Sequence, residues 1–211
     1  TITSVKGSGG IPMAETALML MLMLTKHAVH YLDAQRAKSW QFRENGELNG
    51  MTVGIIGLGH SGADLARKCK VFHMRTLGLR RTDKPCPDID EMFTRDRLHE
   101  FLGQSDFVAI TTPRTPETSG MLGEAELRAM KPTAYLVVTS RGGVAKDGAL
   151  LRALDEGWIA GAALDAHTVE PLPSDSPFWT APNAIVTPHA AAGGPGGEGR
   201  MRMGLLDNLH R

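Results

Sequence analysis

The chain has 211 residues, enough for one or two domains, and we favour one large domain over residues 1–211. Its 23 Lys and Arg balance 23 Asp and Glu, so charge gives no reason to expect nucleic acid or a membrane as partner, and a small neutral or anionic ligand fits better. The two cysteines, Cys69 and Cys86, lack disulfide or metal-ligand spacing, so we expect a cytoplasmic protein with no metal site.

The first predicted element is a long helix from about Pro12 to Trp40, with Pro12 in its first turn. Its apolar run from Leu18 to Leu24 is too short to span a bilayer. Because this run is apolar on every side, we expect one side to pack on its own domain and the other on a second subunit. The alternative is a wholly internal helix, since Met-rich stripes usually pack in a core.

A strand, a glycine loop and a helix follow between Met51 and Lys70. The loop has the pattern G-x-G-x-x-G, formed by Gly57, Gly59 and Gly62. In a dinucleotide-binding fold these glycines permit a tight turn, close approach of backbone N–H groups to a pyrophosphate, and close packing of the helix on the strand. In a chain with 24 glycines the match could be accidental, but the flanking strand and helix favour a dinucleotide site.

The start of this helix is the predicted pyrophosphate site. Helix N-termini bind anions through unpaired N–H groups and the positive end of the dipole. We expect the backbone N–H groups of His60 and Ser61 to serve here. The alternative is that His60 merely faces solvent.

The rest of the chain alternates strands with helices. Strands are predicted at 75–79, 107–111, 134–138, 161–164 and 184–186, and helices at 95–103, 124–130, 147–156 and from about Pro195. This alternation predicts an α/β fold with a doubly wound parallel sheet of the Rossmann type over residues 51–211. Ligands should bind at the carboxyl ends of the strands.

The end of the second strand bears on the choice of cofactor. An acidic residue there accepts hydrogen bonds from the ribose of NAD, whereas arginine accommodates the 2′-phosphate of NADP. This chain has Arg80, Arg81 and Thr82, so NADP is favoured over NAD. The alternatives are a solvated basic pair, or Asp83 as the ribose ligand.

Four further motifs follow in order at 105–118, 130–143, 164–173 and 187–189. They are S-D-F-V-A-I-T-T-P-R-T-P-E-T, M-K-P through T-S-R-G-G, L-D-A-H-T-V-E-P-L-P and T-P-H. Together they resemble the D-isomer-specific 2-hydroxyacid dehydrogenase family over nearly the whole chain. The resemblance implies reversible, NAD(P)-dependent reduction of a small 2-oxo acid such as glyoxylate or hydroxypyruvate, usually by a homodimer.

The catalytic candidates follow from the chemistry of that reaction. His189 could supply the proton, because an ordinary histidine pKa near 6.5 suits proton exchange at neutral pH. Glu170 could orient the imidazole and raise its pKa. Arg141 could bind the substrate carboxylate and polarise the carbonyl. Taken singly, each residue could equally be a solvated surface group.

The resemblance also implies which residues surround the nicotinamide half of the cofactor. They are Thr112, Pro113, Thr139, Ser140, Arg141, Asp165, His189 and Ala191, with Asp165 expected at the carboxamide.

The chain departs from the family pattern at four places. Val138 replaces Asn, Arg114 replaces Leu, Ala166-His167 replaces Val-Phe, and Arg80 replaces Asp. The first three affect substrate and fine geometry, and the last affects the choice of cofactor. His167 is a second histidine close to Glu170, but it stands where the family has an apolar residue.

A second function class fits the same resemblance, namely a corepressor-like regulator that senses the nicotinamide cofactor without catalysis. The intact set of Arg141, Glu170 and His189 favours the enzyme. Family members also carry a second, substrate-binding domain, which we expect to be missing from this chain.

Overall fold

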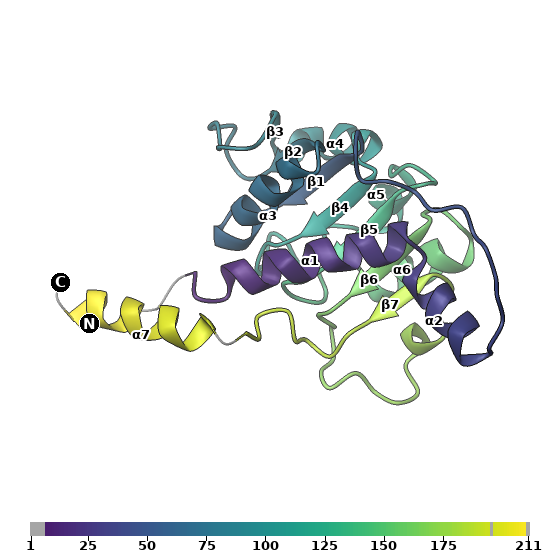
Figure 1. The fold of residues 1–211 in the computed structure, drawn as a ribbon. Helices are drawn as coiled ribbons and strands as arrows, with labels where there is room; N and C mark the ends of the chain where they lie inside the picture. Colours follow the sequence, from purple (N-terminus) through teal and green to yellow (C-terminus); the bar gives the residue numbers. More distant parts are fainter. Residues whose placement is uncertain (1–6, 195, 210–211) are drawn as a thin grey trace.

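The computed structural model describes residues 7–194 and 196–209. Seven parallel strands form one sheet in the order β3-β2-β1-β4-β5-β6-β7 (Figure 1). The strands are β1 (Thr52–Ile56), β2 (Arg75–Leu79), β3 (Glu91–Phe93), β4 (Phe107–Ile110), β5 (Tyr135–Val138), β6 (Gly161–Leu164) and β7 (Ala184–Val186). The predicted doubly wound α/β fold is confirmed.

Helices flank the strands and cover both faces of the sheet. They are α1 (Gly10–Thr25), α2 (Ala28–Arg36), α3 (His60–Val71), α4 (Leu98–Gln104), α5 (Glu124–Arg128), α6 (Asp147–Asp155) and α7 (Gly196–Leu209), with short 3₁₀ helices η1 (Arg95–Arg97) and η2 (Pro177–Trp179). The last predicted helix is thus found one residue beyond Pro195, which lies outside the described residues. No described helix combines the length and apolar character needed to cross a membrane.

The core has two layers, one on each side of the sheet. Side chains of α1 and α3 pack on one face, and those of α4, α5 and α6 pack on the other. Alternate residues of a strand serve opposite layers: Ile55 of β1 joins the first and Ile56 the second. Burial on both faces explains why the central strands are almost wholly apolar.

The prediction of one helix from Pro12 to Trp40 is wrong, because the helix is broken after Thr25. His27 adopts a left-handed conformation with φ of 50°. Tertiary bonds hold the break: Gly46 donates its N–H to the Thr25 carbonyl at 3.1 Å, and Lys26 Nζ donates to the Gly46 carbonyl at 2.8 Å. Contacts with Gly46, about 20 residues further along the chain, therefore stabilise the end of α1.

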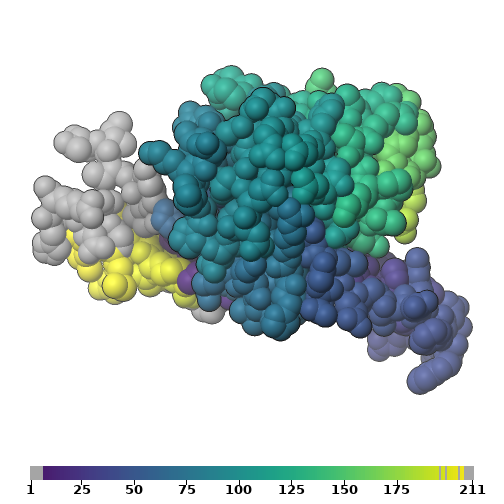
Figure 2. Space-filling model, turned by 90° about the horizontal axis from the view of Figure 1, so that it is seen from above, coloured from purple at the N-terminus to yellow at the C-terminus, as the bar shows by residue number. Residues whose placement is uncertain are grey.

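Residues 37–47, here called the arm, contain no helix or strand and return along the outside of the molecule to β1. The arm and α2 project beyond the body of the domain (Figure 2). Trp40 is fully exposed and Phe42 is nearly so.

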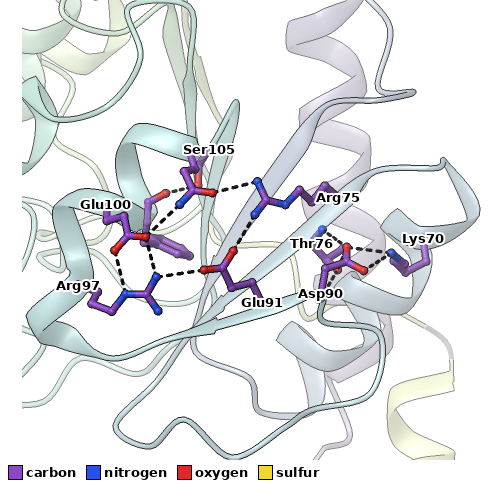
Figure 3. Close-up of polar contacts among 10 residues, drawn as sticks. Lys70, Arg75, Thr76, Asp90, Glu91, Arg97, Glu100 and Ser105 are labelled. Atoms are coloured by element: carbon purple, nitrogen blue, oxygen red, sulfur yellow. Dashed lines mark hydrogen bonds and ion pairs between the residues drawn. The ribbon is translucent and has the colours of Figure 1, made fainter.

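Strand β3 was not predicted, and polar contacts fix it at the edge of the sheet (Figure 3). Arg75 pairs with Glu91 at 2.7 Å, and Glu91 also pairs with Arg97 at 3.1 Å. Next to them, the Asp90 carboxylate accepts the N–H of Thr76 at 2.8 Å and pairs with Lys70 at 2.7 Å. With three residues and a charged start, β3 has too little apolar pattern to be recognised in the sequence.

Candidate active site

The glycine loop after β1 is built by close approaches of its backbone. Gly57 has φ of +97°, and a Cβ there would lie 2.8 Å from the N–H nitrogen of Thr112. A Cβ on Gly62 would lie 2.0 Å from the Gly57 carbonyl oxygen, so only glycine lets α3 pack this closely on the loop. A Cβ on Gly59 would meet nothing within 4 Å. Gly59 is therefore not required by contacts within the chain, and the open space beside it suits a ligand.

Helix α3 begins directly after this loop, with no side chain capping its first N–H groups. First-turn N–H groups lack partners within a helix, so those of His60 and Ser61 are available to an anion. The imidazole of His60 lies elsewhere, beside the N-terminal segment: a Cβ on Gly7 would be 2.7 Å from its Cδ2. Only the backbone of His60 is thus placed at the loop.

Hydroxyl groups tie the neighbouring loops to the glycine loop. Thr111, after β4, donates to the Gly57 carbonyl at 2.5 Å, and Ser140, after β5, donates to the Thr112 carbonyl at 2.7 Å. Thr139 is 1% exposed, and its hydroxyl has no partner among the described residues. Buried hydroxyls normally have a partner, so this one suits a site that a ligand completes.

Pro113 begins the turn that follows β4. Thr118 donates its hydroxyl to the Pro113 carbonyl at 2.8 Å and accepts the N–H of Thr115 at 2.8 Å. The T-x-x-T motif therefore fixes the backbone at Pro113, whose side chain is exposed.

The basic pair after β2 lies at the same edge of the sheet, but its two members differ. Arg81 is exposed, whereas the Arg80 guanidinium donates to loop carbonyls. Those acceptors are Thr82 at 3.1 Å, Lys84, and Pro85 at 3.4 Å. Arg80 thus shapes the loop beside the glycine motif, and Arg81 is the freer cation.

Three predicted residues converge beyond β5, β6 and β7. His189 Nδ1 lies 2.8 Å and 2.9 Å from the two carboxylate oxygens of Glu170, and its Nε2 lies 3.4 Å from Nη1 of Arg141. Because a carboxylate only accepts, Nδ1 carries a proton and Nε2 faces Arg141. Side-chain exposures of 32% for His189 and 35% for Glu170 leave the group open to solvent.

The electrostatics of Glu170 favour its ionised form. Burial acts to raise the pKa of Glu170, but the hydrogen bonds from the His167 N–H and from His189, with the charges of both histidines, lower it overall. Glu170 thus remains an acceptor for His189 well into the acidic range.

Asp165 supports the segment that carries His189. Its carboxylate is 1% exposed and accepts the Thr187 hydroxyl at 2.5 Å and the N–H groups of Ala190 at 3.0 Å and Ala191 at 2.9 Å. Both carboxylate oxygens thus have partners within the chain, and the expected contact of Asp165 with a cofactor carboxamide stays a prediction. Ala191, another predicted cofactor position, is itself buried in this arrangement.

His167 also contacts this segment, through a bond from its imidazole Nε2 to the Thr187 carbonyl at 3.0 Å. The sequence places His167 near Glu170 but gives no sign of this partner 20 residues away.

The comparisons with known proteins agree with this arrangement. The profile of the family described as "D-isomer specific 2-hydroxyacid dehydrogenase, NAD binding domain" matches residues 18–191. A glyoxylate reductase of Korarchaeum cryptofilum is 43% identical over 166 residues, covering 77% of this chain and 49% of that protein. A glyoxylate reductase of Thermococcus gammatolerans is 46% identical over 143 residues, covering 68% of this chain and 42% of that protein.

A solved structure is similar over the whole chain. The D-isomer specific 2-hydroxyacid dehydrogenase of Xanthobacter autotrophicus, in complex with NADPH and MES, has a TM-score of 0.89 and 30% identity, covering 100% of this chain and 86% of that one. The chain spans about half the length of the curated relatives it matches. From the family match and the seven-stranded sheet, the chain belongs to the D-isomer specific 2-hydroxyacid dehydrogenase family and contains its NAD-binding domain.

Proposed function

We propose that this protein reduces small 2-oxo acids, such as glyoxylate or hydroxypyruvate, with NADP(H) as cofactor. The observation that carries the proposal is the convergence of His189, Glu170 and Arg141 at the edge of the sheet that also bears the glycine loop. The names of the two archaeal relatives support the substrate class. In this proposal the 211 residues form one cofactor-binding domain of a two-domain enzyme.

The proposed roles follow from the hydrogen bonds. Glu170 keeps a proton on Nδ1 of His189, so that Nε2 is the nitrogen left to take up the proton destined for the carbonyl oxygen. Once Nε2 is protonated, it and Arg141 present only donors to the space between them, which favours an anionic acid there. Bound nicotinamide would supply the hydride.

The open space beside Gly59, the free N–H groups of α3 and the buried Thr139 hydroxyl support dinucleotide binding at the loop. Residues proposed to hold the dinucleotide are Gly57, Gly59, His60, Ser61, Gly62, Thr112, Pro113, Thr139 and Ser140. Arg81, with the Arg80 loop beside it, supports the preference for NADP over NAD. We propose that Asp165 and Ala191 border the nicotinamide half of the cofactor and also hold the His189 segment in place.

The test has two steps. NADPH binding is measured first, by titrating the fluorescence of the cofactor. Oxidation of NADPH is then followed with glyoxylate, hydroxypyruvate and larger 2-oxo acids, using wild type and His99→Ala, a control whose exposed imidazole lies 3.4 Å from Glu126. If the protein binds NADPH but reduces no 2-oxo acid, even when the substrate domain of a relative is attached, the proposed enzymatic activity is wrong.

We further propose a homodimer formed through α2 and the arm. A groove of about 490 Å³ lies between them, lined by Tyr31, Ala34, Gln35, Lys38, Ser39, Trp40, Gln41 and Phe42. Exposed aromatic side chains beside an apolar groove are typical of an interface, and a two-fold pair would let each arm cover the other's groove. Light scattering should give twice the chain mass for wild type, and a lower mass for the double variant Trp40→Ser, Phe42→Ser. A monomeric wild type would reject this assembly.

A reducing compartment such as the cytoplasm is the proposed location. Both cysteines are free thiols, and burial raises the pKa of the Cys69 thiol to about 12, which makes it unreactive.

A further inference from the structure

His167 is the one histidine near the candidate site to which the proposed reaction gives no role. It stands two residues beyond Asp165, where the resemblance in sequence predicts an apolar side chain. Its imidazole is partly buried between the loop after β6 and the segment after β7.

The protonation of this imidazole follows from its partner. Nε2 lies 3.0 Å from the carbonyl oxygen of Thr187, and a carbonyl can only accept. Nε2 must therefore carry a proton, which makes His167 a donor to the segment that leads to His189.

The backbone of His167 contacts the other half of the candidate pair. Its N–H donates to Oε1 of Glu170 at 2.8 Å, and that oxygen also lies 2.9 Å from His189 Nδ1. Gly142 packs closely on the backbone of His167, because a Cβ on Gly142 would lie only 2.0 Å from the His167 carbonyl carbon. One residue thus contacts both the carboxylate and the segment that carries the imidazole.

The backbone around His189 needs support both before and after this residue. His189 has φ of 53°, a left-handed conformation that is unfavourable for a residue other than glycine and persists only where the surroundings hold it. Asp165 holds the N–H groups that follow, at Ala190 and Ala191. On the carbonyl side, before His189, the donor to Thr187 is His167.

We propose that His167 is a positioning residue that fixes the His189 imidazole relative to the Glu170 carboxylate, by donating from Nε2 to the Thr187 carbonyl. It does not touch substrate in this scheme, and it acts on turnover only through His189, so its effect on turnover rests on the proposed function. The geometric part of the proposal does not.

The first test uses ligand-free protein and does not need activity. Nitrogen NMR of the imidazoles should show His167 in the Nε2–H tautomer. In His167→Phe, which fills the space without a donor, exchange protection of the Ala190 and Ala191 amides should fall by about tenfold. His167→Gln, which keeps an N–H donor near the Nε2 position, should retain most of the protection. His99→Phe is the matched control, since that exposed imidazole is distant in the fold and should change nothing.

The second test measures turnover. His167→Phe should lower kcat by about tenfold, because a small misplacement of a catalytic group is costly. KM for NADPH should stay within about twofold, and His167→Gln should recover most of the loss. A loss of affinity for the cofactor, with kcat unchanged, would mean that His167 merely supports the fold.

The outcomes separate the two proposals. If His167→Phe leaves amide protection and the His189 resonances unchanged, or if His167 is found in the Nδ1–H tautomer, the positioning role is wrong whatever the activity. If the NMR changes occur but no variant or wild-type protein turns over a 2-oxo acid, the positioning role stands and the proposed reaction fails.

Discussion

Asp165 and Ala191 are joined by a 2.9 Å hydrogen bond from the Ala191 N–H to a carboxylate that is 1% exposed. The other carboxylate oxygen accepts the Ala190 N–H and the Thr187 hydroxyl. Water has little access to replace these bonds. A buried carboxylate therefore sets the path of the chain on both sides of His189.

Replacing Asp165 by Asn should destabilise the protein, because the new amide N–H₂ would face a group that can only donate. We expect a loss of about 1–3 kcal/mol in the free energy of unfolding, the cost of a buried unsatisfied donor. Urea denaturation measures it, with Asp175→Asn on an exposed loop as control. Equal midpoints for the two variants would show that the carboxylate does not hold the segment.

His189→Ala should lower kcat by about 10²-fold and leave the NADPH dissociation constant within about twofold, since it removes a proton donor and not a binding group. Glu170→Gln should shift the pH profile of turnover toward acid, because the ionised partner of the imidazole is lost. Steady-state kinetics across pH, with fluorescence titration of NADPH, test both. Wild-type turnover and pH dependence in both variants would make the pair purely structural.

Arg81 should carry most of the discrimination between the two cofactors, because Arg80 is engaged with its own loop. We expect wild type to bind NADPH at least about tenfold more tightly than NADH, or roughly 1.4 kcal/mol, and Arg81→Ala to abolish most of this difference. Arg80→Ala should weaken binding of both cofactors, through disorder of the loop. Titrations with each cofactor decide the point, and equal affinities in wild type would contradict it.

The contacts of Asp90 should make the free energy of unfolding depend on pH in the acidic range. Burial acts to raise the pKa of Asp90, but its bonds with Lys70 and Thr76 lower it overall, below the ordinary value of 3.8. Because the folded-state pKa is the lower one, the stabilisation is present above pH 3.8 and is lost as the pH falls through the lowered pKa.

Asp90→Asn should therefore be less stable than wild type at neutral pH, and the gap should close as the pH falls through the lowered pKa of Asp90. Denaturant midpoints measured from neutral to acidic pH give this curve. Asp88→Asn is a suitable control, because Asp88 is an exposed residue of the same loop with a left-handed backbone that Asn tolerates. A gap that stays constant with pH would refute the assignment.

The openness of the site predicts low activity for these 211 residues alone. Arg141 is exposed, and His189 and Glu170 are about one third exposed, so water screens their charges. We expect NADPH binding, but turnover at least about 10³-fold slower than when the substrate domain of a relative is attached, because orientation and exclusion of water are lost. Comparable turnover in a side-by-side assay would show that no second wall is needed.

Local patterns were enough to predict six of the seven strands and the glycine loop. A run such as Thr52–Ile56 is apolar on both faces because helices cover both, so its sequence already carries the information. The break after Thr25 could not be predicted in the same way, since a bond from Gly46, distant in sequence, fixes it. Within the candidate site, the sequence motifs identified Arg141, Glu170 and His189. The links from Asp165 and His167 to the segment after β7 appear only in three dimensions.

Helix α1 is synthesised before α3, β5 and β6, the elements on which it packs. At roughly 5–20 residues per second, the ribosome needs on the order of 10 s to add the chain from the end of α1 to the end of β6. Throughout that interval the native cover of the face bearing Leu20, Met21 and Leu24 is incomplete. We expect the nascent chain to engage general chaperones through this helix, and cooperative folding to begin only after β6 has left the ribosomal tunnel.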